Sequence, residues 1–165
     1  MGADIFGDLK DWGRVLETIE RVRMREGLEE HQAGLARILR YRENWRLADR
    51  VLRVVPEVRQ ASDLLIAEVC NILVMSDVHP DIRVRAARAL GHLLVHRPDQ
   101  VSSFDPARTL QTMSDVVARG CPPALEEALE EAISAAEASI LHRVRGPRGE
   151  RRVQVQGNKP NRAQS

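Results

Sequence analysis

The feature that most constrains the fold is the spacing of apolar residues, which recur three and four positions apart along almost the whole chain. That spacing places them on one face of an α-helix, whereas a strand requires alternation. The sequence therefore predicts an all-α protein. Start signals such as Asp before Pro, and stop signals such as Gly, divide the chain into about seven helices. We expect them at about 9–24, 29–41, 44–55, 57–75, 80–96, 105–120 and 122–142.

The odd-numbered helices share one apolar frame at relative positions 0, 4 and 7. The frames are Val15, Ile19 and Val22; Leu47, Val51 and Val54; Ile82, Ala86 and Ala89; Leu125, Leu129 and Ala132. Successive frames begin 32, 35 and 43 residues apart. Helix pairs repeated at such a period each carry an apolar face that only a neighbouring pair can cover. We therefore predict a solenoid of antiparallel helix pairs over residues 1–142.

The segment 77–93 makes this prediction more specific. It combines an Asp, a Pro-acid pair, Ile followed by Arg, two alanines and then Ala-Leu-Gly-His-Leu. This pattern resembles the second helix of a bacterial HEAT repeat, of the HEAT-like or PBS-lyase type. The resemblance implies a short right-handed α-solenoid in which the second helix of each pair lines a concave surface. It also implies a structural hydrogen bond between repeats for Arg83.

Arginines recur at relative positions 3 and 6 of the odd helices. They are Arg21, Arg50, Arg53, Arg85 and Arg88. Position 6 points away from the apolar frame, so these side chains would face solvent. On a concave surface they would attract an acidic or extended partner. The alternative is a solvated face with i,i+4 ion pairs such as Asp49–Arg53 and Glu17–Arg21.

Two tryptophans, Trp12 and Trp45, occupy similar places in the first and third helices. We expect Trp45 to fill a junction between repeats. Trp12 lies in the terminal repeat, so it is the better candidate for an exposed anchor that contacts a partner.

Residues 143–165 form a basic segment with a net charge of +6, which leaves −5 on the first 142 residues. Its glycine, proline and charge content predicts a disordered tail. Arg151 and Arg152 could contact an acidic partner or nucleic acid. The plainest alternative is a solubilising extension.

The cysteines and histidines do not predict a catalytic or metal site. Cys70 falls in an apolar run and should be a core residue, and Cys121 precedes a helix start that could lower the pKa of its thiol. His92 and His96 have a metal-capable spacing, but no third ligand is evident and no His-Glu pair occurs. We predict no metal and no cofactor. Two cysteines and the lack of a signal peptide or an apolar span favour a cytoplasmic setting.

The leading hypothesis is a non-catalytic protein-protein interaction scaffold or adaptor, or an assembly-factor subunit. It would bind an acidic or extended segment of another protein. One alternative is nucleic-acid binding through the arginines and the tail, although the charge of −5 on residues 1–142 opposes it. A second alternative is an enzyme similar to bilin lyases, which contain HEAT-like repeats. That likeness covers the repeat and no catalytic residue.

Overall fold

The computed structural model describes residues 4–96 and 105–145, and every regular element within them is helical. The elements are α1 Trp12–Arg25, η1 Glu29–His31, α2 Gln32–Arg40, α3 Trp45–Val54, η2 Val55–Glu57, α4 Asp63–Val74, α5 Pro80–His96, α6 Pro106–Ala118 and α7 Pro123–Arg145, where η marks a 3₁₀ helix. The prediction of an all-α protein with about seven α-helices is confirmed for the described residues.

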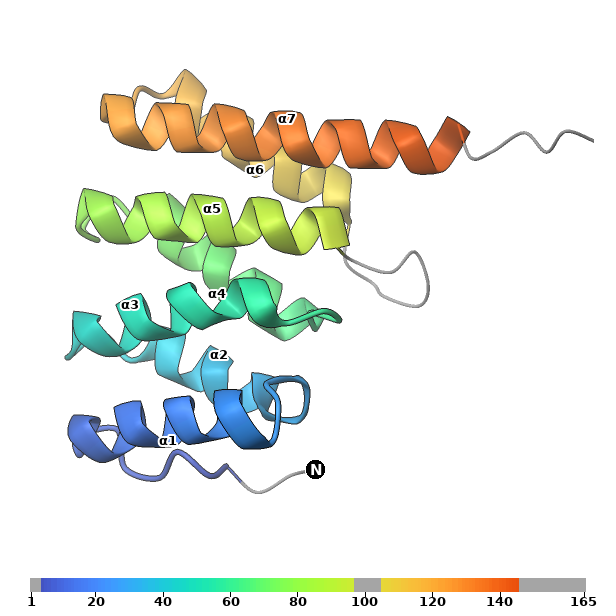
Figure 1. Ribbon diagram of the computed structural model, residues 1–165. Coiled ribbons are helices and arrows are strands. Elements are labelled where there is room, and N and C mark those ends of the chain that lie inside the picture. The colour runs from blue at the N-terminus through green and yellow to red at the C-terminus, as the bar shows by residue number, and fades with distance from the viewer. Residues whose placement is uncertain (1–3, 97–104, 146–165) are drawn as a thin grey trace, which may run out of the picture.

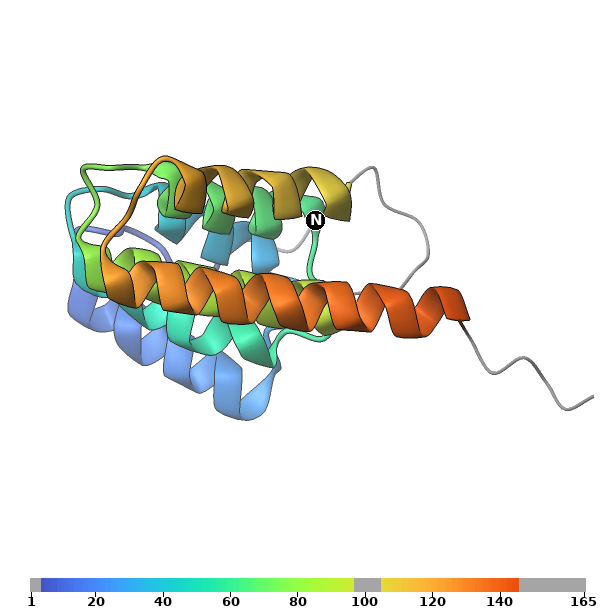
Figure 2. The same cartoon turned by 90° about the horizontal axis from the view of Figure 1, so that it is seen from above.

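The helices are arranged in two layers. The odd helices α1, α3, α5 and α7 lie side by side in one layer, and α2, α4 and α6 form the other (Figures 1 and 2). Each even helix packs on the odd helix that follows it in the chain. Because contacts run from each element to its spatial neighbour, α1 and α7 lie at opposite ends of the stack (Figure 1).

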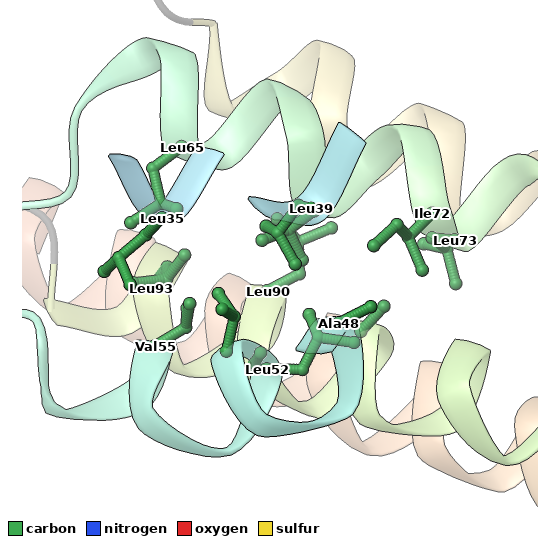
Figure 3. Close-up of a cluster of buried hydrophobic side chains, with 14 of the residues drawn as sticks. Leu35, Leu39, Ala48, Leu52, Val55, Leu65, Ile72, Leu73, Leu90 and Leu93 are labelled. Atoms are coloured by element: carbon green, nitrogen blue, oxygen red, sulfur yellow. The ribbon is translucent and has the colours of Figure 1, made fainter. Parts of the chain in front are cut away.

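The apolar frame predicted for the odd helices forms one side of the core, since all twelve frame residues are buried. Leucines of α2, α3, α4 and α5 meet between the two layers (Figure 3). Full burial of one such side chain contributes about 1.5–3 kcal/mol. Leu35, Leu65 and Leu90 have no exposure, and Leu39 is 1% exposed. Interlayer packing of aliphatic residues therefore holds the stack together.

Two glycines allow close approaches that a larger residue would block. Gly91 of α5 faces Ala132 of α7, and Gly34 of α2 lies against the ring of Phe6. The chain before α1 is held there, because Phe6 and Leu9 are both buried. The N-terminal segment thus packs on α2 as part of the core.

The fourth helix begins later than predicted, at Asp63 instead of near residue 57. Val55–Glu57 continues α3 as a 3₁₀ turn, and Ser62 caps α4 by accepting a hydrogen bond from the Leu65 amide. The intervening loop is held by α2 and η1. The Glu29 carboxylate accepts from the Arg59 amide, and the Gln32 side chain accepts from the Ser62 amide.

The last helix extends to Arg145, three residues past its predicted end at His142. Arg143 donates hydrogen bonds to the Val95 carbonyl at the end of α5 and, at 3.2 Å, to Ser139 Oγ. A cation is favourable at a helix C-terminus, where carbonyl groups lack helical partners. Arg143, which we assigned to the tail, therefore fastens α7 to α5.

Candidate functional site

A groove of about 760 Å³ lies at the N-terminal ends of α3 and α5. Two segments form its edges, the one before α3 and the one before α5. Its lining comprises Leu39, Tyr41, Arg42, Trp45, Ala48, Asp49, Arg53, Ile72, Asp77, Val78, His79, Asp81, Ile82 and Arg85. The volume lies in the range typical of sites that hold small molecules or peptide side chains.

The groove forms because successive repeats place equivalent segments next to each other. Asn44 caps α3 through its side chain, which accepts from the Arg46 amide at 3.0 Å. Pro80 starts α5, and its fixed φ suits the first helical turn. Because α3 and α5 begin on the same side of the stack, the segments that precede them lie next to each other.

The floor of the groove is apolar and its rim is charged. Leu39, Ala48, Ile72 and Ile82 are buried hydrophobic residues. The rim has three arginines and three aspartates, namely Arg42, Arg53, Arg85, Asp49, Asp77 and Asp81. The formal charges of these six side chains cancel. The groove is therefore an apolar recess with a balanced polar rim.

Asp49 is the centre of a charged triad on the rim. Its Oδ2 lies 2.9 Å from Nε of Arg53 one turn later, and its Oδ1 pairs with Arg85 of α5. The Asp49 side chain is only 17% exposed, so the triad is partly shielded from water. The i,i+4 pair Asp49–Arg53 occurs as the solvated-face alternative predicted. The same aspartate also ties α3 to α5.

Arg50 is neutralised in the same way one repeat earlier. It pairs with Glu20 of α1, and Glu20 also lies 3.2 Å from Arg23. Arg23 in turn contacts Glu57 at 2.7 Å. Three of the five helix arginines predicted to bind a partner, Arg50, Arg53 and Arg85, are thus paired with carboxylates.

The other two of these five helix arginines, Arg21 and Arg88, are exposed. Within residues 4–96 and 105–145, neither Arg21 nor Arg88 has an ion pair, and the alternative pair Glu17–Arg21 is not formed. Arg88 borders a second, shallower recess of about 280 Å³ between α5 and α7, which includes His92, His96 and Glu131. The arginines therefore do not form one continuous basic surface.

The two tryptophans are linked by Arg46, whose guanidinium carbon lies 5.6 Å from the Trp12 ring centroid and 5.7 Å from that of Trp45. These distances suit cation–π contacts. Trp45 is 62% exposed and Trp12 is 44% exposed. The expectation that Trp45 fills a repeat junction is wrong, because it is the first residue of α3 and borders the groove. Trp12 is partly open, as predicted.

Arg83 has the structural role expected of it, in a different place. Its Nε donates to the Leu73 carbonyl near the end of α4 at 2.9 Å. The bond joins two helices that pack as a pair, whereas the family resemblance implied a bond between repeats.

The cysteines are free thiols with raised pKa values. Burial raises the pKa of Cys70 to about 11, although a hydrogen bond with Thr109 opposes the shift. Cys70 is half-buried and packs against the core, as predicted. Burial and then the charge of Glu126 raise the pKa of Cys121. The suggestion that the helix start lowers the Cys121 pKa is therefore wrong.

The rings of His92 and His96 are 4.3 Å apart between centroids, and burial followed by the charge of His96 lowers the pKa of His92. In the described part of the chain, no group of three or more His, Cys, Asp or Glu side chains is placed to hold a metal. None of its helices combines the length and apolar character needed to cross a bilayer. Arg151 and Arg152 lie outside the described residues.

Sequence reasoning missed most of the groove. Tyr41, Arg42, Val78 and His79 come from the segments before α3 and α5, whereas the arginine pattern was sought within the helices. An aromatic or apolar residue precedes each of these helix starts, but Tyr41 lies four residues before α3 and Val78 two residues before α5, so no common spacing marked the groove. No family model, no curated protein and no solved structure matches this chain.

Proposed function

We propose that this chain is a non-catalytic, HEAT-like interaction scaffold that holds an extended segment of a partner protein in the groove between α3 and α5. The observation that carries the proposal is the exposed Trp45 ring at the edge of an apolar recess. Large aromatic side chains bordering pockets are the residues that contribute most to protein interfaces. The free thiols fit a reducing, cytoplasmic setting.

The groove favours an extended segment with both apolar and polar side chains over a strongly acidic one. Its floor can accept an apolar side chain, since Ile72 and Ile82 lie there. On the rim, Asp49 already pairs with Arg53 and Arg85, so their charge is partly used. Arg42 remains available to an anionic group and Asp77 to a cationic one, while Asp81 Oδ2 lies 3.8 Å from His79 Nδ1. The balanced charge of the rim therefore favours an extended segment of mixed character over the acidic segment that the sequence alone allowed.

Nucleic-acid binding has weaker support. A phosphate backbone would meet three aspartates on the rim, and three of the five helix arginines predicted to bind a partner are paired with carboxylates. The feature in favour of nucleic-acid binding is the exposed Trp45 ring, which could stack on a base. The two functions differ in salt dependence, because phosphate contacts release counterions.

The test uses the full chain with Trp12→Phe, so that Trp45 is the only tryptophan and reports on the groove. A phage-displayed library of random peptides is selected on this protein, and the enriched peptides are titrated by fluorescence. We expect peptides that shift Trp45 emission and that, once fluorescently labelled, bind at least tenfold more weakly to Trp45→Ala, which removes an exposed side chain and leaves the core intact. Arg59→Glu, an exposed change away from the groove, is the control.

Two results would overturn the scaffold proposal. One is a selection in which no peptide is enriched over an unrelated helical protein. The other is tight binding of a fluorescent single-stranded oligonucleotide that weakens steeply with salt and depends on Trp45, with no peptide binding. The second result would make nucleic acid the partner.

A further inference from the structure

The two ends of the helix stack carry stripes of charged side chains of opposite sign. Neither stripe lines the groove. At one end, α1 presents Arg14, Arg21 and Arg25, all exposed. At the other, α7 presents Glu126, Glu130 and Glu137, also all exposed. At 100° per residue, each set falls within a stripe about 40° wide on its helix. Each end thus carries a narrow stripe of one sign, and exposed Glu17 borders the arginine stripe about 40° from Arg21.

The arginine stripe points away from the rest of the stack. Contacts to the next odd helix come from the opposite side of α1, where Glu20 pairs with Arg50 and Trp12 approaches Arg46. Within the described residues, no ion pair involves Arg14, Arg21 or Arg25.

The glutamate stripe also points outward. On α7, the side that faces α5 is defined by Ala132 against Gly91 and by Ser139, which donates to the Val95 carbonyl at 3.2 Å. Glu126, Glu130 and Glu137 lie roughly 120–180° around the helix from these residues. None of the three has an ion pair among the described residues.

We infer that a second copy of this chain binds here, with the arginine stripe of α1 in one copy against the glutamate stripe of α7 in the next. The spacing supports this occupant. The arginines are seven and then four residues apart, and the glutamates four and then seven. All three pairs can form if the helices meet antiparallel, and the outer two pairs can form if they meet parallel. A terminal repeat needs only a polar outer face, which mixed charges would provide.

The contact is heterologous, because different surfaces of the two copies meet. Such contacts produce a ring or an open chain of subunits, not a closed two-fold dimer. Exposed charges bring the copies together but are screened by salt. We therefore expect weak association that depends on concentration and falls as ionic strength rises.

The experiment is sedimentation of the full chain over a range of concentrations at about 50 mM and about 500 mM salt, where the Debye length falls from roughly 14 Å to roughly 4 Å. At low salt we expect the average mass to rise above 18.6 kDa with concentration. At high salt the dissociation constant should weaken at least tenfold. A protein that stays monomeric at low salt and high concentration overturns the inference.

Charge reversal identifies the surfaces. Arg21→Glu/Arg25→Glu makes both ends acidic, and Glu126→Arg/Glu130→Arg makes both ends basic, so neither variant should self-associate. An equimolar mixture of the two should associate again, as should one chain with all four changes. Arg59→Glu is the control, and circular dichroism checks that each variant is folded. Failure of the mixture to associate would contradict the pairing.

A competing occupant is the basic C-terminal segment. If association survives Arg21→Glu/Arg25→Glu and is lost with Arg151→Glu/Arg152→Glu, the acidic stripe binds that segment and the inference is wrong. Because these substitutions lie outside the groove, peptide binding at Trp45 should be unchanged by them. The proposed function and this inference can therefore fail separately.

Discussion

A β-carbon built on Gly91 of α5 would lie 2.6 Å from the β-carbon of Ala132 on α7 and 2.9 Å from its α-carbon. The two helices therefore touch through backbone and a single methyl group. No side-chain rotation can relieve a clash at this point, because the nearest atoms belong to the backbone and to Cβ. This contact sets how closely the last odd helix packs on the stack.

Gly91→Ala should destabilise the fold by about 1–3 kcal/mol, the usual cost of overpacking, despite a gain in helix propensity of about 1 kcal/mol. Urea unfolding followed by circular dichroism measures the change. Gly13→Ala is the matched control, since Gly13 is also helical and its added β-carbon would meet nothing within 4 Å. The control should be neutral or slightly stabilising. Equal effects at both positions would contradict the packing explanation.

Arg40→Met should cost about 2 kcal/mol of unfolding free energy, because it leaves a buried carboxylate without its cation. The Glu68 side chain is 8% exposed, and its Oε1 lies 2.6 Å from Arg40 Nε. Asn71 provides only one further hydrogen bond, at 3.3 Å. Glu68→Gln in the Arg40→Met background should recover part of the loss. Arg59→Met, at an exposed position, should change stability by less than about 0.5 kcal/mol.

Both thiols should react slowly with iodoacetamide in the folded protein. With a pKa of about 11 instead of 9.0, Cys70 is roughly 1% thiolate at pH 9, compared with half for a free cysteine. Single-cysteine variants, Cys121→Ser and Cys70→Ser, separate the two rates. Cys121 should also react more slowly than a free cysteine, because burial and Glu126 raise its pKa. Rapid labelling of Cys121 at neutral pH would contradict this.

The same shift predicts how stability depends on pH. The folded protein keeps the Cys70 proton up to about pH 11, while the unfolded chain releases it near pH 9.0. The raised pKa therefore contributes stability below pH 9 that is lost as the pH rises towards 11. In Cys70→Ala this part of the alkaline loss should disappear, as a comparison of urea midpoints between pH 8 and 10.5 would show.

Acrylamide should quench Trp45 more strongly than Trp12. Trp45 is 62% exposed and Trp12 is 44% exposed. The single-tryptophan variants Trp12→Phe and Trp45→Phe isolate each ring. Arg46→Ala should increase quenching of both, because Arg46 covers part of each ring. Stronger quenching of Trp12 would instead favour the junction-filling role first expected of Trp45.

The helices could be predicted because the spacing of apolar residues in each helix indicates which of its faces is buried. The frame residues Val15, Leu47, Ile82 and Leu125 are all buried, as their positions required. The start of α4 could not be predicted in this way. It depends on Glu29 and Gln32, which bind amides about thirty residues later in the chain. A hydrogen bond between such distant residues leaves no local pattern.

The candidate site was predicted less well for a similar reason. The arginine pattern correctly located exposed or half-exposed positions, but not the carboxylates opposite them. Arg85 is paired with an aspartate 36 positions earlier, and Arg50 with a glutamate 30 positions earlier. Only the packed helices bring these charges together. The groove likewise depends on two segments that are adjacent in space and separated in sequence.

The loop between η2 and α4 should be cut by proteases more slowly than its exposure suggests. Arg59 is exposed, and by sequence its peptide bond to Gln60 is a target for trypsin. Yet the amides of Arg59, Gln60 and Ser62 are all bound to side chains of η1 and α2. A protease must draw its substrate into an extended strand and take up those amides itself. An accessible cleavage site can therefore be a resistant one, and the rate of cutting there would measure how often η1 and α2 release the loop.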